Sequence, residues 1–277
     1  MPEEANDAET HDTPTREVAP VRALAGREFE IPLPSRGVLY DGKLPTGKVV
    51  VRPLTTKEEA VLYAPTGDAV TKINSIISAC IVTRDVPPEE LLMVDRFAIL
   101  LSLRTASLGP IYEFPFRCRY CNTQFKARVN IADEFDIKFM EETATEPFET
   151  TLPICGRRVS FRLLRGKDET GIARHAKKVR MRSADSGDPS FIHRMAVQIV
   201  AVDGVEVNQM QAERFVNTPL DLGDSNALRI AVEKVESGID TTCYMDCPQC
   251  GATNDADMPF SVEFFRPDNP GCGGDAA

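Results

Sequence analysis

The chain of 277 residues is 42% apolar, which is enough for one large domain or two of ordinary size. Acidic residues outnumber basic ones by 42 to 32, and the formal charge of −10 argues against a nucleic-acid partner, because phosphate binding needs a basic surface. The polar, acidic start does not resemble a signal peptide, and no run of eighteen apolar residues occurs, so we expect no secretion signal and no membrane span. In the reducing cytoplasm that this implies, the eight cysteines are more typical of metal ligands than of disulfides.

The two ends of the sequence differ in composition from the rest. Residues 1–27 and 267–277 are rich in polar and small residues and poor in large apolar ones. Such segments cannot bury enough surface to offset the entropy lost on ordering. We therefore expect a disordered acidic tail at the start and a flexible tail at the end.

The first half, residues 28–140, begins with alternating apolar residues and a Ser-Arg-Gly turn in "FEIPLPSRGVLY". A short strand follows, and Thr55 or Thr56 is expected to cap the next helix, which has acidic residues in its first turn. Apolar residues at helical spacing over 73–81 predict a second helix. Asp95 is expected to cap a third helix, "RFAILLSLRT", which is apolar on most sides and therefore central to the core.

The second half, residues 141–266, repeats these patterns in the same order. "VSFRLLRGKDE" resembles "VVVRPLTTKEE" in its apolar residues, its arginine at the fourth position and its acidic end. "MAVQIVAVDGV" resembles "ISACIVTRDV" in the same way. Asp224 precedes "SNALRIAVEKVESG", whose apolar residues form one helical stripe.

Three landmarks place the two halves in one register. They recur with spacings of 14 and then 9 positions: Asp95, Gly109 and Cys118 in the first half, and Asp224, Gly238 and Cys247 in the second. Two unrelated helices often align by chance, but chance does not also bring a cap, a glycine and a cysteine pair into register. We interpret the sequence as a diverged internal duplication.

Two Cys-x-x-Cys pairs complete the comparison: Cys118 with Cys121, and Cys247 with Cys250. Two intervening residues let one tight turn direct both sulfurs at a single ion, and four thiolates favour zinc over hard cations. The residue after each second cysteine is asparagine in "CRYCN" and glycine in "CPQCG", the two types that best tolerate a left-handed backbone. We predict that these cysteines hold about one structural Zn²⁺ per chain in a zinc ribbon of two hairpins, with no open position for catalysis.

Three alternatives to this zinc site stay open. The four cysteines could be unliganded and reduced, they could hold an iron–sulfur cluster, or Cys243 could replace one of them as a ligand. Cys80 lies on an apolar helical face and is expected to pack in the core. Cys155 and Cys272 carry no indication of a role.

We expect no enzymatic activity, because the sequence shows no catalytic constellation. The histidines, His11, His175 and His193, lie near no serine or cysteine motif that indicates a triad, and no phosphate-binding glycine loop occurs. Carboxylates are abundant but scattered, so a hydrolase is only a third possibility.

The stretch over residues 157–182 is strongly basic and carries the main alternative function. Together with a zinc ribbon, it would suit a nucleic-acid-binding regulator. It would equally suit a solvated helix face or a patch that meets an acidic partner. Aromatic residues that could stack on bases are absent between positions 162 and 190, which disfavours the nucleic-acid reading.

Several short motifs carry a resemblance to a known family: "LPSRGVLY", then "VRPLTTKEE", then "VDRFAILLSLRTASLGPIYEFPFRCRYC". In their order they resemble the baseplate hub-subunit family of T4-like contractile bacteriophage tails, where a helix runs into a cysteine pair. The match covers residues 29–135, with a weaker similarity through 265. The long acidic tail and the complete second cysteine pair depart from the family pattern. The resemblance implies a phage tail protein that acts in assembly of the baseplate hub.

These predictions describe an α+β protein of two related halves joined by a four-cysteine zinc ribbon. We expect a non-enzymatic structural or assembly protein of the baseplate that contacts other phage tail proteins. Its expected location is the virion tail baseplate, or the host cytoplasm during assembly. We expect neither a nucleic-acid nor a membrane partner, and the sequence leaves the oligomeric state open.

Overall fold

The computed structural model describes residues 23–24, 28–132, 135–182, 188–217, 220–260 and 262–265. The predicted tails lie outside these ranges, except that Ala23–Leu24 forms a short strand, β1, which pairs with β2 (Glu28–Pro32). Helices and strands are both abundant, and every strand pairing among the described residues is antiparallel. The predicted α+β class is therefore confirmed.

Residues 28–140 are called the first half from here on, and residues 141–265 the second half. The first half contains, in chain order, β2, β3 (Lys48–Val51), α1 (Thr56–Tyr63), α2 (Ala69–Cys80), the 3-10 helix η1 (Pro88–Glu90), α3 (Met93–Leu108), β4 (Ile111–Arg117), β5 (Gln124–Asn130) and β6 (Asp136–Lys138). The second half contains β7 (Phe148–Thr151), β8 (Arg158–Phe161), α4 (Gly166–Arg182), α5 (Pro189–Gln198), β9 (Ile199–Val202), β10 (Val205–Glu206), α6 (Gln209–Asn217), α7 (Leu222–Val235), β11 (Gly238–Asp240), β12 (Thr242–Asp246), β13 (Thr253–Asp257) and the 3-10 helix η2 (Val262–Phe265).

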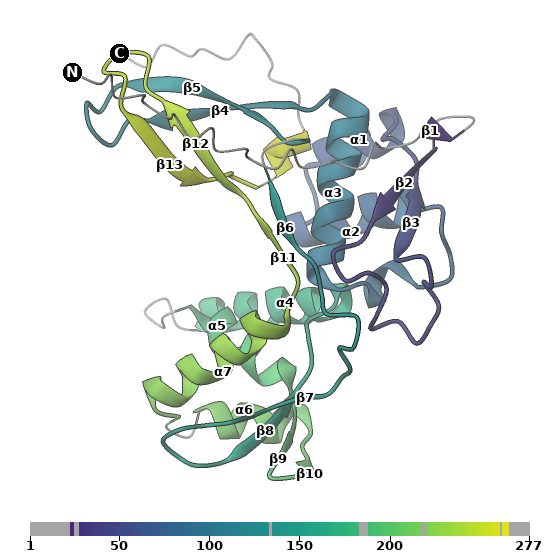
Figure 1. The fold of residues 1–277 in the computed structure, drawn as a ribbon, viewed down its shortest axis with the longest axis vertical. Coiled ribbons are helices and arrows are strands. Elements are labelled where there is room, and N and C mark those ends of the chain that lie inside the picture. Colours follow the sequence, from purple (N-terminus) through teal and green to yellow (C-terminus); the bar gives the residue numbers. More distant parts are fainter. Residues whose placement is uncertain are drawn as a thin grey trace, which may run out of the picture.

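The strands form one sheet in each half and three two-stranded pairs. The larger sheets have the orders β1-β2-β3 and β10-β9-β8-β7, and the pairs are β4-β5, β12-β13 and β11-β6. In Figure 1 the helices and sheet of the first half lie above those of the second. The hairpins β4-β5 and β12-β13 lie together at the upper left. The pair β11-β6 joins strands from different halves.

Each half has a hydrophobic core of its own. The second core lies between the β7–β9 strands and helices α5, α6 and α7, around the fully buried Phe161. The first core contains Cys80, as predicted, and also takes in Met258 and Phe264 from the end of the chain. Arg104 on α3 holds that end in place, because its Nε donates to the carbonyl oxygen of Phe264 at 2.9 Å.

Helix α1 begins where the sequence predicts. The Thr55 side chain accepts from the amide of Lys57, and Glu58 accepts from the Thr55 amide at 2.8 Å, which makes a capping box. The Arg52 guanidinium donates to both carboxylate oxygens of Glu58, at 2.9 and 3.2 Å. This fork fixes the strand–helix turn after β3.

The turn after β8 makes the same contacts. Arg162 donates to both oxygens of Asp168, at 2.7 and 2.9 Å, and the amide of Arg165 donates to Asp168 at 2.8 Å. The backbone amide of Arg162 donates to Gln198 at the end of α5, at 2.8 Å. In the first half Arg52 makes the equivalent bond, to the last residue of α2, at 2.9 Å. The similarity between the two sequence stretches thus reflects one shared set of contacts.

Asp95 does not cap α3, contrary to the sequence prediction. The helix begins two residues earlier, at Met93, and Asp95 is fully buried in its first turn. Its carboxylate accepts from the amide and hydroxyl of Ser35, at 3.0 and 2.5 Å, and from the Tyr40 hydroxyl at 2.5 Å. The Tyr40 oxygen in turn accepts from the amide of Leu92 at 2.8 Å. Asp95 therefore fastens the "LPSRGVLY" loop onto α3.

Asp224 occupies the same place in α7. It also lies inside the first turn and is buried, and it accepts from the amides of Ile154 and Cys155, at 2.7 and 3.0 Å. These residues belong to the loop between β7 and β8, the counterpart of the loop between β2 and β3. In both halves, an aspartate on the last long helix binds the backbone of the hairpin loop.

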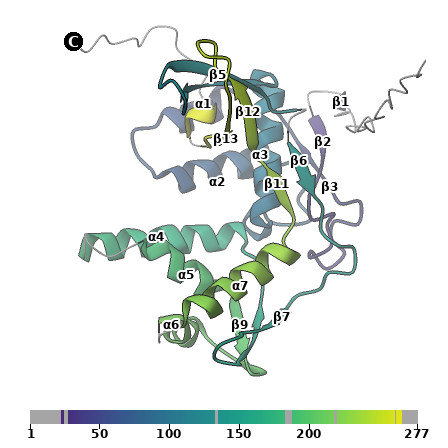
Figure 2. The same ribbon diagram turned by 60° about the vertical axis from the view of Figure 1, so that its left-hand side comes forward.

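The two halves meet at a short backbone pairing, called the seam from here on. Leu91–Met93, which leads into α3, runs antiparallel to Leu164–Gly166, which leads into α4. The amide of Met93 donates to the carbonyl of Leu164 at 3.1 Å, and the amide of Gly166 donates to that of Leu91 at 3.0 Å. Beside the seam, α2 and α4 face each other (Figure 2), and Asn74 donates to Thr170 at 3.1 Å. The hairpins β4-β5 and β12-β13 are therefore not the sole junction between the halves.

Candidate metal centre

The first cysteine turn connects β4 to β5. The backbone amide of Cys118 donates to the carbonyl oxygen of Thr123 at 2.9 Å, and the backbone amide of Asn122 donates to the carbonyl oxygen of Cys118 at 3.0 Å. Asn122 has a φ of 62°, in the left-handed region that asparagine tolerates better than most residues. This turn places both Cys118 and Cys121 on its inner side.

The second cysteine turn connects β12 to β13 and has the same hydrogen bonds. The backbone amide of Cys247 donates to the carbonyl oxygen of Ala252 at 3.0 Å, and the backbone amide of Gly251 donates to the carbonyl oxygen of Cys247 at 2.9 Å. Gly251 has a φ of 69°, matching that of the asparagine in the first turn. The sequence correctly indicated which residue after each cysteine pair adopts this conformation.

The two turns bring all four predicted ligands together. The ligand atoms of Cys118, Cys121, Cys247 and Cys250 all lie within 4.8 Å of one another. The sulfurs of Cys118 and Cys250 are 3.8 Å apart, and those of Cys121 and Cys247 are 3.5 Å apart. A tetrahedral zinc ion with Zn–S bonds of about 2.3 Å places its sulfurs about 3.8 Å from one another, whereas a disulfide requires about 2.05 Å. The spacing fits a metal site and does not fit disulfides.

The thiols occupy an environment that favours partial ionisation. The backbone amide of Cys121, followed by that of Tyr120, donates to the Cys118 sulfur and lowers the pKa of that thiol to about 6. The amide of Ala252 also lowers the pKa of Cys250, but burial and the neighbouring sulfurs outweigh it and raise that pKa to about 12. Four thiolates this close repel one another, so the set can be fully ionised only around a cation.

Asn254 supports the centre and was missed by the sequence analysis. It is 1% exposed and lies on β13, yet it contacts the turn of the other hairpin. Its side-chain oxygen accepts from the amide of Arg119 at 2.9 Å, and its side-chain nitrogen lies 3.6 Å from the Cys118 sulfur. A lone asparagine four residues after a cysteine has no sequence signature, so only the fold reveals this contact.

The other cysteines of the described chain lie away from the four sulfurs. Cys243 is buried in the first core, and its sulfur lies 3.3 Å from the carbonyl oxygen of Thr241. It does not belong to the ligand group, so the alternative in which it replaces one of the four is not supported. Cys155 is exposed in the β7–β8 loop, and Cys272 lies outside the described residues.

One further group of possible ligands occurs among the described residues: His175, His193 and Glu213. The two imidazole rings are stacked, with centroids 3.9 Å apart and planes 7° apart. Glu213 lies 2.9 Å from Nδ1 of His193. One ligand atom of each residue lies within 4.8 Å of the others. The stacked rings and the carboxylate also join three helices, α4, α5 and α6, as a packing contact.

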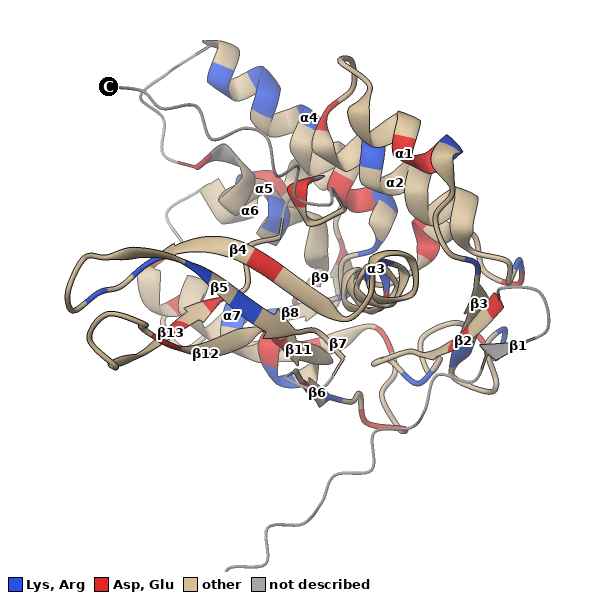
Figure 3. Ribbon diagram, turned by 90° about the horizontal axis from the view of Figure 1, so that it is seen from above, with Lys and Arg blue, Asp and Glu red and all other residues tan. Residues whose placement is uncertain are grey.

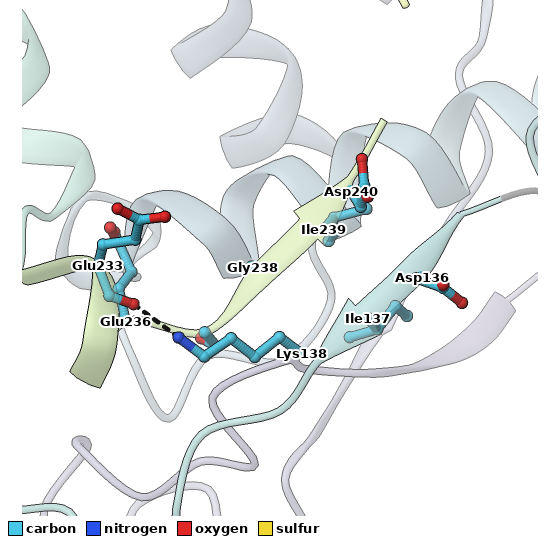
Figure 4. A pocket seen from close by; sticks show the side chains of 9 residues that line it. Asp136, Ile137, Lys138, Glu233, Glu236, Gly238, Ile239 and Asp240 are labelled. Carbon is cyan, nitrogen blue, oxygen red and sulfur yellow. Dashed lines mark hydrogen bonds between the residues drawn. The ribbon is translucent and has the colours of Figure 1, made fainter. Parts of the chain in front are cut away.

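A hollow of about 500 Å³ opens beside the β11-β6 pair (Figure 4). Acidic groups line it, but its one lysine, Lys138, is held by the end of α7, where it donates to the carbonyl oxygens of Glu233 and Lys234 at 2.6 and 3.2 Å. A cation at a helix C-terminus satisfies unpaired carbonyls there. The lysine thus has a structural role.

The basic stretch divides into two parts. Four of its first five cations form ion pairs: Arg157 with Asp203, Arg162 with Asp168, Arg165 with Glu146 and Lys167 with Glu90. Arg158 lies on β8, and the other cations lie along α4, where Figure 3 shows basic residues toward the free end of the helix. Arg174, Lys177 and Lys178 form no ion pair with any residue that the structure describes. Much of the positive charge of this stretch is therefore paired with acidic residues of the same chain.

The family described as T4 bacteriophage base plate protein matches residues 37–266, which include Asp95, the seam and all four cysteines. The chain belongs to this family. No curated protein and no solved structure matches the chain. The predicted family resemblance is thus confirmed at the level of the baseplate.

Membership in this family makes the chain a phage baseplate protein, with a place in the virion tail and other tail proteins as partners. None of the described helices is long and apolar enough to cross a bilayer.

Proposed function

We propose that this protein is a non-enzymatic hub component or hub assembly factor of the baseplate, built from two duplicated halves and stabilised by one structural zinc ion. The observation that carries the metal assignment is the spacing of the four sulfurs, which suits a tetrahedral zinc–thiolate centre. All four positions of such an ion are filled by protein, so it has no site for substrate. Its role is to hold the two hairpins rigid for contact with other tail proteins.

The duplication is supported by contacts that recur at equivalent positions. The Arg–carboxylate fork, the aspartate that binds the hairpin loop and the hydrogen bonds of the cysteine turn each occur once in each half. Unrelated halves would have to reach these arrangements independently. The proposed domain boundaries follow, with the first unit over 28–140 and the second over 141–266.

Elemental analysis tests the zinc assignment. Protein purified without added metal should contain about one zinc per chain. Replacing Cys121 with serine should remove most of it, whereas the matched change Cys155→Ser should leave it in place. Zinc well below one equivalent, with all thiols free to react, would end the proposal; iron with visible absorbance would instead assign a cluster.

Fractionation of phage tails tests the role in the hub. The chain should co-purify with completed baseplates if it is a hub component, and only with assembly intermediates if it is an assembly factor. Absence from both would contradict the proposed function.

The zinc-ribbon nucleic-acid-binding regulator is a second candidate, favoured only by the exposed cations on α4. Filter binding over a range of salt concentrations separates it from the first, since phosphate contacts weaken steeply with salt. We expect no salt-dependent retention of single- or double-stranded nucleic acid.

A further inference from the structure

Each half contains one segment of each of the two kinds that pair in the seam, so the chain has four such segments and the seam uses only two of them. Leu91–Met93 lies two to four residues before Asp95, and Leu220–Leu222 lies at the same distance before Asp224. Likewise, Leu164–Gly166 follows Arg162 as Leu54–Thr56 follows the equivalent arginine of the first half. Each half therefore carries both kinds of segment. Inside the chain, the Leu91–Met93 segment of the first half pairs with the Leu164–Gly166 segment of the second.

The two remaining segments are more open to solvent than those in the seam, because Leu54 and Leu220 are half-buried while Thr56 and Leu222 are exposed. In the seam, Leu91, Leu164 and Gly166 are buried. By contrast, Leu222 is 82% exposed, and Thr56 is exposed as well. The structure gives neither Leu222 nor Thr56 an amide hydrogen bond to another described residue, although the equivalent amides form the two bonds of the seam.

The helices beside the open segments also present apolar side chains. Asn74 on α2, six residues before the end of its helix, bonds to Thr170 on α4 in the seam. The equivalent positions are Ile192 on α5, which is 39% exposed, and Ala60 on α1, which is exposed. The polar pair Asn74 and Thr170 in the seam thus corresponds to the apolar pair Ile192 and Ala60 beside the open segments. Two apolar side chains can pack against each other where the seam has a hydrogen bond.

We propose that the protein self-associates head to tail, with Leu220–Leu222 of one copy paired to Leu54–Thr56 of the next. The amide of Leu222 donates to the carbonyl of Leu54, and the amide of Thr56 donates to that of Leu220, as in the seam. α1 of one copy then packs against α5 of its neighbour. Because the two surfaces differ, the contact is heterologous and can repeat, giving a ring where the rotation closes and a filament where it does not.

Each of the two segments can be disabled by a single substitution that is expected to leave the fold intact. Leu222→Glu places a charge at a position that is 82% exposed and would be buried by the contact. Thr56→Pro removes the amide donor, together with an exposed threonine side chain. Proline is favoured at the first position of a helix, and Thr55 has the extended conformation, with φ −119° and ψ 176°, that precedes proline. Tyr244→Glu, on the ribbon at a side chain that is 74% exposed, is the control.

Sedimentation velocity of the full chain over a concentration series gives the first test. The wild type and the Tyr244→Glu control should associate, and each surface variant should weaken association about tenfold or more, while melting temperatures stay unchanged. A wild type that stays monomeric at every accessible concentration overturns the proposal.

Mixing the two variants gives the decisive test. Leu222→Glu retains an intact Leu54–Thr56 surface, and Thr56→Pro retains an intact Leu220–Leu222 surface. Mixed in equal amounts, they should form a complex of two chains and nothing larger, because the second pair of surfaces is disabled. If the mixture stays monomeric while the wild type associates, the contact is not head to tail.

Discussion

Asp95 and Asp224 hold equivalent positions, but their surroundings differ. Asp95 accepts from two hydroxyls and one amide, whereas Asp224 accepts from two loop amides. Burial, partly offset by hydrogen bonds from Ser35 and Tyr40, raises the pKa of Asp95 above its usual range. The first loop is thus held by the hydroxyl groups of Ser35 and Tyr40, which both need a hydrogen-bond acceptor at position 95.

Asp95→Asn should therefore destabilise the protein more than Asp224→Asn. The amide nitrogen of an asparagine cannot accept from Ser35 and Tyr40, so we expect a loss of about 2 kcal/mol in the free energy of unfolding. Asp224→Asn should cost about 1 kcal/mol, since one carbonyl oxygen still accepts from an amide. Urea denaturation monitored by circular dichroism measures both, and an equal or reversed order would contradict the contact assignment.

Glu58 should make stability depend on pH. The hydrogen bonds from Arg52 lower the pKa of this carboxyl to about 2, against the partly opposing effect of burial. A carboxyl whose folded pKa lies below its unfolded pKa stabilises the fold above the unfolded value, about 4.3, and loses that contribution as the pH falls toward 2.

Glu58→Gln should accordingly lower the free energy of unfolding by about 2 kcal/mol at pH 7, and the deficit should shrink between pH 5 and pH 2. The exposed Glu59→Gln is the matched control and should change little at any pH. A deficit that is constant across this range would show that the ion pair does not stabilise the fold.

Among the elements, the cysteine turns depend on a left-handed residue after the second cysteine. Gly251 has a φ of 69°, and a β-carbon there would meet no other atom within 4 Å, so only the backbone conformation opposes substitution. Gly251→Ala should cost about 1 kcal/mol and lower zinc affinity, because the turn positions two of the ligands. Gly171 on α4 also has open space around it but ordinary helical geometry, so Gly171→Ala should stabilise by about 0.5–1 kcal/mol. Thermal melts of both variants, with and without chelator, measure the difference.

The sequence revealed the elements whose signals are local. The Thr55 cap and the helical face over 73–81 follow from neighbouring residues, and both occur in the fold. The predicted Asp95 cap is wrong because the partner of that carboxylate, Ser35, lies 60 positions away. Asn254 was missed for the same reason, since its contact with Arg119 spans 135 positions.

At the scale of the whole molecule, the repeat register predicted that the four cysteines cluster, because it replaces a contact between distant residues with a comparison of two local patterns. The seam has no such pattern. Its pairing involves two backbone hydrogen bonds and segments that the repeat register does not align with each other. It joins the halves in addition to the cysteine hairpins and the β11-β6 pair, so loss of the metal should release the hairpins and leave the halves joined.

Removal of zinc should thus have a confined effect that the two cysteine turns share. Zinc binding to small structural modules contributes on the order of 10–16 kcal/mol, but each half here also has its own core. Cys118→Ser and Cys247→Ser should each lose the ion and resemble the chelated wild type, although the two residues lie in different halves. The double variant should add little, because residues that act as one unit are not additive. Limited proteolysis should show new cuts near 118–130 and 243–258, while the seam and the long helices stay protected. Each single variant exposing only its own turn would mean that the two turns do not share an ion.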